Sequence, residues 1–199
     1  MKKIVTVIAL LCSFASHAQF KNTLIYGHIG GGKGSFNSIN FGLNFVKNNT
    51  VFSVGYLSLY KGMEDLPSYY DGYGWGPIVA DPPNQVMAGI TLEAGKMFTF
   101  GQSRSRFALK GGLFIGKYTY PDNIRRSYGG FFESPYTWDI VSQESFGFII
   151  HPTYELAAFR HAGLSFGTRI NINSAKSSLD FDVNLLLGKV CNRRVVSKN

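Results

Sequence analysis

The chain contains few charged residues, few cysteines and almost no long apolar run. Charged residues make up 16% of its 199 positions, against about 25% in an average soluble domain. The two cysteines are Cys12 and Cys191, and Cys12 falls in an N-terminal segment that we expect to be removed, so no intramolecular disulfide can form. Beyond residues 4–14, no stretch approaches the roughly 18–20 apolar residues of a membrane-spanning helix. The sequence therefore excludes a disulfide scaffold and a helical membrane protein.

The N-terminus has the pattern of a secretory signal. Lys2 and Lys3 precede the apolar residues 4–14, and residues 16–18 form a small-x-small cleavage site. We therefore expect a signal peptide over residues 1–18, one domain over 19–190 and a basic tail over 191–199. Loss of the two lysines would lower the formal charge from +8 to +6. An exported chain of this charge is expected to meet anionic lipid headgroups and no nucleic acid.

Most of the remaining chain alternates apolar and polar residues with a period of two, which is typical of β-strands with one apolar face. Ile39, Phe41, Leu43 and Phe45, for example, alternate with small or polar residues. The pattern predicts eight strands, several of them near the 9–11 residues that cross a bilayer at a tilt. In residues 24–31 and 51–60 both faces are apolar, so the pattern does not assign which face points outward. The eight predicted strands are 24–31, 38–46, 51–60, 86–95, 107–116, 146–156, 164–172 and 179–187.

The connections between these strands alternate in length. Tight turns are predicted at residues 47–50, 101–105 and 159–162, and long loops at 61–84 and 119–142, with shorter links at 32–37 and 173–178. With up-and-down topology all three tight turns fall at one end and both long loops at the other. Short periplasmic turns and longer extracellular loops are the layout of bacterial outer-membrane barrels.

The two faces favour a membrane barrel. The apolar face carries nearly unbroken Leu, Ile, Val and Phe, and the polar face carries glycines, small residues and single charges, which suit the narrow lumen of eight strands. The signal, the strands and the alternating connections resemble the small OmpA/OmpX-like outer-membrane barrels over nearly all of residues 20–190. The resemblance implies an all-β, eight-stranded antiparallel up-and-down transmembrane β-barrel in the outer membrane of a Gram-negative bacterium. A soluble exported β-barrel carrier is the alternative fold.

No arrangement of residues predicts a catalytic, cofactor-binding or metal site. Residues 27–33 fit the start of a phosphate-binding loop, but Gly34 stands where a Ser or Thr would hold magnesium. The three mature histidines, His28, His151 and His161, lack metal-ligand spacing. Ser145, His151, Glu155 and Ser165 could form a Ser-His-Glu hydrolase, but the His-x-Ser pair of the barrel-shaped lipid A deacylases is missing at residues 161–163. We expect no enzyme and no cofactor; an enzyme acting on outer-leaflet lipid is the alternative.

Function is expected to lie in the long loops. Residues 61–84 hold Tyr69, Tyr70, Tyr73 and Trp75, and residues 119–142 combine aromatic residues with Arg125 and Arg126. Exposed aromatic side chains stack on sugars or proteins, and paired arginines suit the phosphates of lipopolysaccharide. The sequence predicts a monomeric barrel with a filled lumen and a structural or surface-interaction role. Its expected partners are outer-membrane lipid, lipopolysaccharide and a surface glycan or protein.

The alternation also makes predictions about single residues. On the apolar face, Ile90, Leu109, Phe148, Ile170 and Val183 are expected to face lipid. In the lumen, antiparallel pairing is expected to bring Arg169 opposite Asp182, Asn171 opposite Asp180 and Glu93 opposite Lys110. A shift of one residue would move these charges into lipid, so the inward facing follows from the pattern more firmly than the partners do.

Overall fold

The eight strands form one closed barrel. A computed structural model describes residues 23–63, 66, 83–100, 104–126 and 136–191. The predicted signal peptide, the turn residues 101–103 and the tail from residue 192 lie outside the described residues. No helix in the described ranges is long and apolar enough to cross a membrane. The strands are β1 (Thr23–Gly34), β2 (Asn37–Lys47), β3 (Thr50–Gly62), β4 (Asn84–Thr99), β5 (Ser105–Arg126), β6 (Tyr136–Leu156), β7 (Ala162–Asn173) and β8 (Ser178–Lys189).

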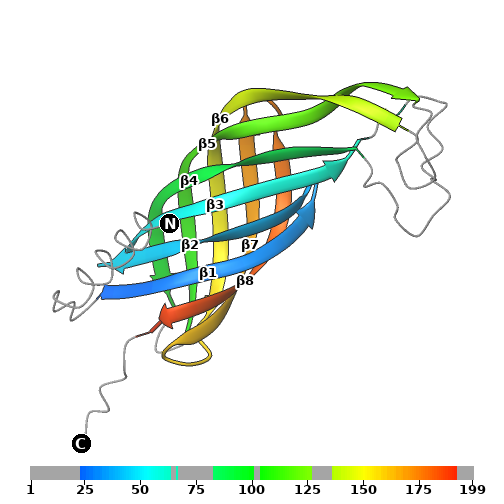
Figure 1. Ribbon diagram of the computed structural model, residues 1–199. Coiled ribbons are helices and arrows are strands. Elements are labelled where there is room, and N and C mark those ends of the chain that lie inside the picture. The colour runs from blue at the N-terminus through cyan, green and yellow to red at the C-terminus, as the bar shows by residue number, and fades with distance from the viewer. Residues whose placement is uncertain (1–22, 64–65, 67–82, 101–103, 127–135, 192–199) are drawn as a thin grey trace, which may run out of the picture.

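Each strand pairs antiparallel with the next, and β1 pairs with β8 to close the ring (Figure 1). At this seam the backbones approach closely beside Gly30 and Gly32 of β1. A Cβ atom at Gly30 would lie 2.1 Å from the carbonyl oxygen of Val183, and one at Gly32 would lie 2.2 Å from that of Phe181. Only glycine fits such distances, so the glycine-rich residues 27–33 belong to a strand at the seam and do not form a phosphate loop.

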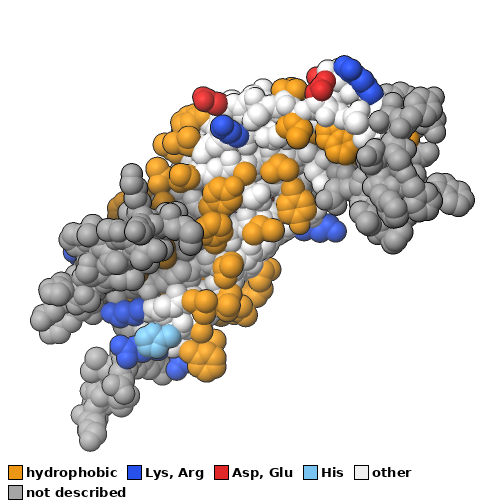
Figure 2. All heavy atoms as spheres, in the orientation of Figure 1, with side chains coloured by type: hydrophobic (Ala, Val, Ile, Leu, Met, Phe, Trp, Pro, Cys, Tyr) orange, Lys and Arg blue, Asp and Glu red, His pale blue; other side chains and the backbone are white. Residues whose placement is uncertain are grey.

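The apolar face predicted from the alternation points outward. Ile90, Leu109, Phe148, Ile170 and Val183 are between 37% and 59% exposed, which confirms their expected facing. Figure 2 shows hydrophobic side chains spread over the outer surface along the strands. A closed barrel that exposes such a surface fits a lipid environment, because lipid is the solvent that lowers the cost of exposing it.

The structure also settles the two strands whose facing the sequence left open. In β1, Tyr26 is buried and Ile29 is exposed. In β3, Phe52 points outward, whereas Leu57 and Leu59 are fully buried. The inner face of β3 is therefore as apolar as its outer face, which explains why periodicity could not assign it.

The turn between β2 and β3 is a two-residue hairpin. Asn48 and Asn49 have φ angles of 49° and 60°, the left-handed conformation that a type I′ turn requires at both central positions and that Asn tolerates. The β6–β7 connection is also short: the Phe159 N–H donates to the Ala162 carbonyl at 2.9 Å. The tight turns predicted at residues 47–50 and 159–162 are confirmed.

The prediction of a long loop over residues 119–142 was wrong for most of its length. β5 runs to Arg126 and β6 begins at Tyr136, so both strands continue past their neighbours as a two-stranded extension, seen at the upper right of Figure 1. The register shifts between Asp122 and Arg125, where Asn123 has a φ of 49°. Pro121, Asp122 and Asn123 are turn-forming residues, but here they lie at a bulge that the extended pair accommodates. Of the other predicted loop, residues 64–65 and 67–82 lie outside the described part.

A charged side chain on the outer face should destabilise the barrel. We expect Ile170→Arg and Val183→Arg each to cost about 2–4 kcal/mol if the position lies near the bilayer midplane. Denaturant titration in lipid vesicles measures this free energy. Gln143→Arg, on the exposed extension beyond β7, is the matched control and should change stability little. Parental stability of both outer-face variants would show that this face does not meet hydrocarbon.

Candidate functional site

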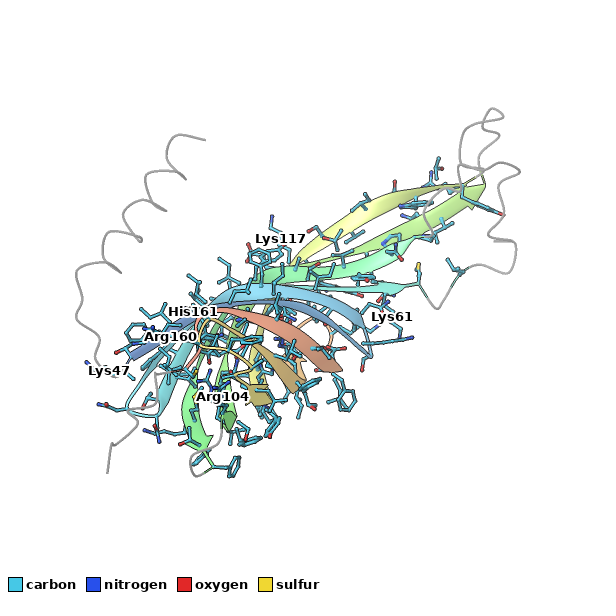
Figure 3. The ribbon with its side chains drawn as sticks, turned by 90° about the horizontal axis from the view of Figure 1, so that it is seen from below. Lys47, Lys61, Arg104, Lys117, Arg160 and His161 are labelled. Atoms are coloured by element: carbon cyan, nitrogen blue, oxygen red, sulfur yellow. The ribbon has the colours of Figure 1, made fainter. Side chains whose placement is uncertain are left out.

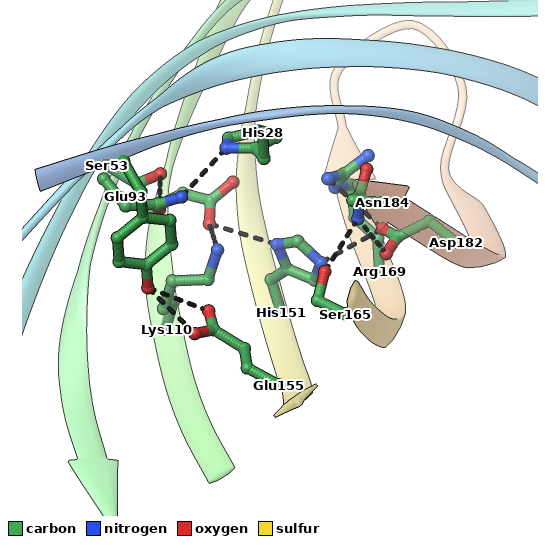
Figure 4. A network of polar contacts seen from close by, with 12 residues as sticks. His28, Ser53, Glu93, Lys110, His151, Glu155, Ser165, Arg169, Asp182 and Asn184 are labelled. Atoms are coloured by element: carbon green, nitrogen blue, oxygen red, sulfur yellow. Dashed lines mark hydrogen bonds and ion pairs between the residues drawn. The ribbon is translucent and has the colours of Figure 1, made fainter. Parts of the chain in front are cut away.

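A network of ion pairs lies in the middle of the lumen (Figure 4). Glu93 Oε2 lies 3.0 Å from Lys110 Nζ and 3.1 Å from His151 Nδ1. On the opposite edge of the His151 imidazole, Nε2 lies 3.0 Å from Asp182 Oδ2, and this carboxylate oxygen also pairs with Arg169 at 3.2 Å. His151 therefore bridges two carboxylates, and the network joins β4, β5, β6, β7 and β8. No side chain in it is more than 5% exposed.

A second ionic cluster lies nearer the tight turns. Arg106 Nε and Nη2 both lie 2.7 Å from Glu155 Oε2, and the Tyr26 hydroxyl donates to the same carboxylate at 2.9 Å. Arg106 also donates to the carbonyl oxygen of Val190 and stacks on the Tyr26 ring at 5.0 Å. The sequence analysis missed this cluster, although Arg106 has the inward parity of Lys110 and Glu155 has that of His151.

Polar side chains of β1, β2 and β3 extend the lining of the lumen. Asn44 Nδ2 donates to His28 Nδ1 at 3.0 Å, and the Ser53 hydroxyl donates to Asn44 Oδ1 at 2.7 Å. Near the end of the barrel away from the tight turns, Asp180 accepts from the Ser178 hydroxyl at 2.7 Å and from the Phe36 N–H at 3.0 Å. Pairing of this kind compensates the loss of water around buried polar groups.

Apolar clusters lie on both sides of the ionic network. The cluster at the tight-turn end includes Tyr26, Met97 and Leu186. The cluster at the other end includes Phe36, Met87 and Phe114. All six side chains are at most 3% exposed. The interior is thus layered around the His151 network, which lies between the two apolar clusters. Arg106 and Glu155 contact Tyr26 of the first cluster, and Asp180 accepts from the Phe36 N–H of the second. In the six strands whose facing the sequence assigned, the alternation had predicted a polar inner face.

The predicted luminal partners were correct as contacts in two cases, but the predicted registers were wrong by two residues. Arg169 stands opposite Asp180 and pairs with Asp182, which lies two positions along β8. Lys110 stands opposite Gly95 and pairs with Glu93 in the same way.

The third predicted pair also fails in register, because Asn171 stands opposite Ser178 rather than Asp180. Long side chains on one face reach diagonal neighbours of the adjacent strand. The prediction that these side chains face the lumen is confirmed. The buried residues are Glu93, Lys110, Arg169, Asn171, Asp180 and Asp182.

The residues considered for a hydrolase do not come together as a triad. Both ring nitrogens of His151 face carboxylates, so neither is directed at a serine hydroxyl. Glu155 is held by Tyr26 and Arg106 in the other cluster, and Ser165 accepts from Asn184 at 3.3 Å. Ser145 contacts Asn173, and His161 is exposed at the β6–β7 turn.

Metal binding finds no support in the same region. In the described part of the chain, no three His, Cys, Asp or Glu side chains are grouped so that they could hold a metal ion. The charged side chains of the lumen can therefore neutralise one another and hold neighbouring strands together. Among the described residues, they do not position a serine hydroxyl as a catalytic nucleophile.

Comparison with known proteins finds no matching family model and no matching curated sequence. Solved structures do match over 83% of the chain. The N-terminal β-barrel domain of Pseudomonas aeruginosa OprF aligns with a TM-score of 0.52 at 9% identity over 96% of its own length. Neisserial surface protein A aligns with a TM-score of 0.52 at 16% identity over 95% of its length. The Yersinia pestis attachment invasion locus protein Ail, in complex with the heparin analogue sucrose octasulfate, gives 0.45 at 10% identity over 96%.

The chain has the fold of the small outer-membrane β-barrels. Closure of eight strands, the exposed apolar outer face and the matches at a TM-score of 0.52 agree on this. The predicted resemblance and the fold class are confirmed, and this fold is the one expected for the predicted location in a Gram-negative outer membrane. At sequence identities of 9% and 16%, this similarity shows that the chain shares the fold of these barrels.

The ion pair between Arg169 and Asp182 should be energetically coupled. We expect Arg169→Ala to cost about 3–5 kcal/mol, because it leaves Asp182 buried with one partner fewer. The double variant with Asp182→Ala should cost less than the two single variants summed, by about 0.5–3 kcal/mol. Denaturant titration of the four proteins measures this coupling. Additive effects would contradict the pairing, and Asn173→Ala on the same strand, outside the network, serves as the control for general strand damage.

Proposed function

We propose that the chain is an outer-membrane barrel with a filled lumen that acts as a structural or surface-interaction component through the extension of β5 and β6. We call this extension the β5–β6 arm; it comprises residues 120–126 and 136–145. We further propose that the arm lies outside the cell and the tight turns lie in the periplasm, the orientation usual for such barrels. The arm is the observation that carries the proposal.

The arm extends past the ends of its two neighbouring strands, β4 and β7. β5 pairs with β4 only as far as Val86 opposite Thr119, and β6 pairs with β7 from Gly147 opposite Asn173. Past these points, residues 120–122 and 139–145 have neither β4 nor β7 beside them, and within the described part of the chain their strand pairing is between β5 and β6. An unpaired edge presents N–H and C=O groups that another extended polypeptide can bind. The arm is thus suited to strand addition by a protein partner.

The side chains of the arm also favour a polypeptide partner. Ile140 is 72% exposed. This apolar side chain lies on the arm, beyond the paired strands of the barrel. Around it the charges are mixed, because Asp139 lies 3.9 Å from Arg125 and also accepts from Asn123 at 3.2 Å. An exposed apolar residue among charges of both signs fits a protein surface better than the uniformly negative phosphates of lipopolysaccharide.

The layered interior supports the filled lumen and argues against a pore. An eight-stranded barrel has an interior that side chains just fill, and here an apolar layer lies on each side of the buried ionic network. The same network supports a non-enzymatic role, because it engages both nitrogens of His151. Release of fatty acid from purified lipopolysaccharide by the chain would favour the alternative of a lipid-modifying enzyme.

Site-specific photo-crosslinking in intact cells tests the role of the arm. A photoreactive residue at Ile140 should give an adduct with a second polypeptide, and one at Phe166, on the exposed barrel wall, should give none. Protease sensitivity of the adduct distinguishes a protein from lipopolysaccharide. Equal results at both positions, or adducts with lipid alone, would contradict the proposal.

The orientation is checked in the same cells. In a Cys191→Ser background, Gln143→Cys should react with a membrane-impermeant thiol reagent before lysis, and Asn49→Cys only after it. The reverse order would place the arm in the periplasm.

A further inference from the structure

The outer wall of the barrel is hollowed near the tight-turn end. A groove of about 610 Å³ extends from β1 to β5, and its walls include the exposed side chains of Leu43, Phe52, Val54 and Leu92. Its floor is made of small residues, Ala94 of β4 and Gly111 of β5. The volume lies in the range of small-molecule sites, and the lining is almost wholly apolar. Its position on the outer face directs it toward lipid.

Two lysines stand at the tight-turn end of this groove. Phe45, Phe52 and Ala94 are opposite one another on three adjacent strands, and Lys47, Thr50 and Lys96 form the next row on the same face, two residues nearer the turns. Two residues of strand span about 7 Å. Lys96 Nζ donates to the Thr50 hydroxyl at 2.9 Å, which holds this ammonium over the start of β3. Both lysines are exposed.

The charge around these lysines is of one sign. Arg104 and Arg160 are exposed at the same end, and Figure 3 shows them there with Lys47 and His161. The carboxylates of the described residues lie elsewhere: Asp122, Asp139 and Glu144 are on the β5–β6 arm, and Glu93, Glu155, Asp180 and Asp182 are in the lumen. On the face that Figure 2 shows, the visible acidic side chains lie in the upper part of the view, away from the basic ones at this end. The groove therefore opens toward positive charge. Glu93 is the one carboxylate among its described lining residues, and it is buried in the lumen, where it pairs with Lys110.

We propose that the groove and the two lysines bind one anionic phospholipid of the leaflet at the tight-turn end. One acyl chain lies in the groove over Ala94 and Gly111, and the phosphate lies between the ammonium groups of Lys47 and Lys96. The geometry matches the order of parts in a phospholipid, with the apolar chain deeper in the wall and the charged group at the strand ends. This site goes beyond the proposed role of the arm and lies at the opposite end of the barrel.

Lipid retention by the folded full-length barrel tests the proposal. The detergent-purified protein is mixed with equal amounts of phosphatidylglycerol and phosphatidylcholine that carry the same acyl chains, and bound lipid is counted by native mass spectrometry. We expect preferential retention of phosphatidylglycerol. Lys47→Gln and Lys96→Gln should each lower that preference about fivefold, which corresponds to about 1 kcal/mol per basic residue near a membrane surface. Lys33→Gln, at the other end, should leave the preference unchanged.

A second pair of variants tests the groove. Ala94→Leu fills the floor and should reduce retention of both lipids. Ala88→Leu, on the same face of the same strand but outside the groove, should have no effect. Heat-dependent gel mobility confirms that each variant is folded, so that loss of lipid is not mistaken for loss of structure.

Three results would overturn the site: no preference for phosphatidylglycerol, equal effects of Lys33→Gln and Lys96→Gln, or equal effects of the two alanine variants. Binding of soluble glycerol phosphate that Ala94→Leu leaves intact, without retention of phospholipid, would also overturn it, because the lysines would then bind phosphate without the groove.

Discussion

In the hydrocarbon of a bilayer, an unpaired backbone N–H or C=O group costs several kcal/mol, because no water is present to bind it. Pairing of β1 with β8 removes the two edges that an open eight-stranded sheet would leave. The close approach beside Gly30 and Gly32 shows where the sequence accommodates this seam. In the β5–β6 arm, which we propose lies outside the hydrocarbon, this requirement does not apply, and the strands continue past the ends of β4 and β7. The arm is therefore a candidate for function because it is free of the constraint that fixes the ring.

Closure also determines what the interior must do. Charged residues at inward positions are enclosed by the ring, and removing charges from water is unfavourable unless they are paired. His151 meets this need by lying between Glu93 and Asp182, and Arg106 does so with Glu155 and Tyr26. Five strands are joined through the first network, so it also fixes their mutual placement. The apolar clusters on either side of the His151 network keep water from its pairs, which strengthens each of them.

Much of the fold could be predicted from the sequence, because facing in a strand depends only on the parity of a position. Residues such as Ile170 and Arg169 therefore had their sides assigned correctly before any partner was known. The diagonal contacts of Arg169 with Asp182 and of Lys110 with Glu93 depend on side-chain length and on the stagger of strands, which period-two patterns do not contain. Phe114, Ile149 and Leu186 were missed as interior residues because an apolar residue at an inward position breaks the pattern.

The arm and the lipid groove were harder to predict for different reasons. Pro121, Asp122 and Asn123 are residues of turns, and only the pairing with β6 shows that they form a bulge in a continuing strand. The groove arises from the alignment of Ala94 and Gly111 on different strands, 17 positions apart in the sequence. Their proximity follows from register, as does the row of Lys47, Thr50 and Lys96. Features built across strands could therefore not be found along the chain.

The β1–β8 seam is the most direct test of this account. Ile29 and Leu185 are opposite each other across it and both point outward, so their Cα atoms lie within reach of a disulfide. In a Cys191→Ser background, Ile29→Cys with Leu185→Cys should form an intramolecular disulfide on mild oxidation of the membrane-inserted protein. Ile29→Cys with Ile170→Cys, one strand further away, should not. Failure of the first pair to link, or equal linking of both pairs, would contradict a closed barrel with this register.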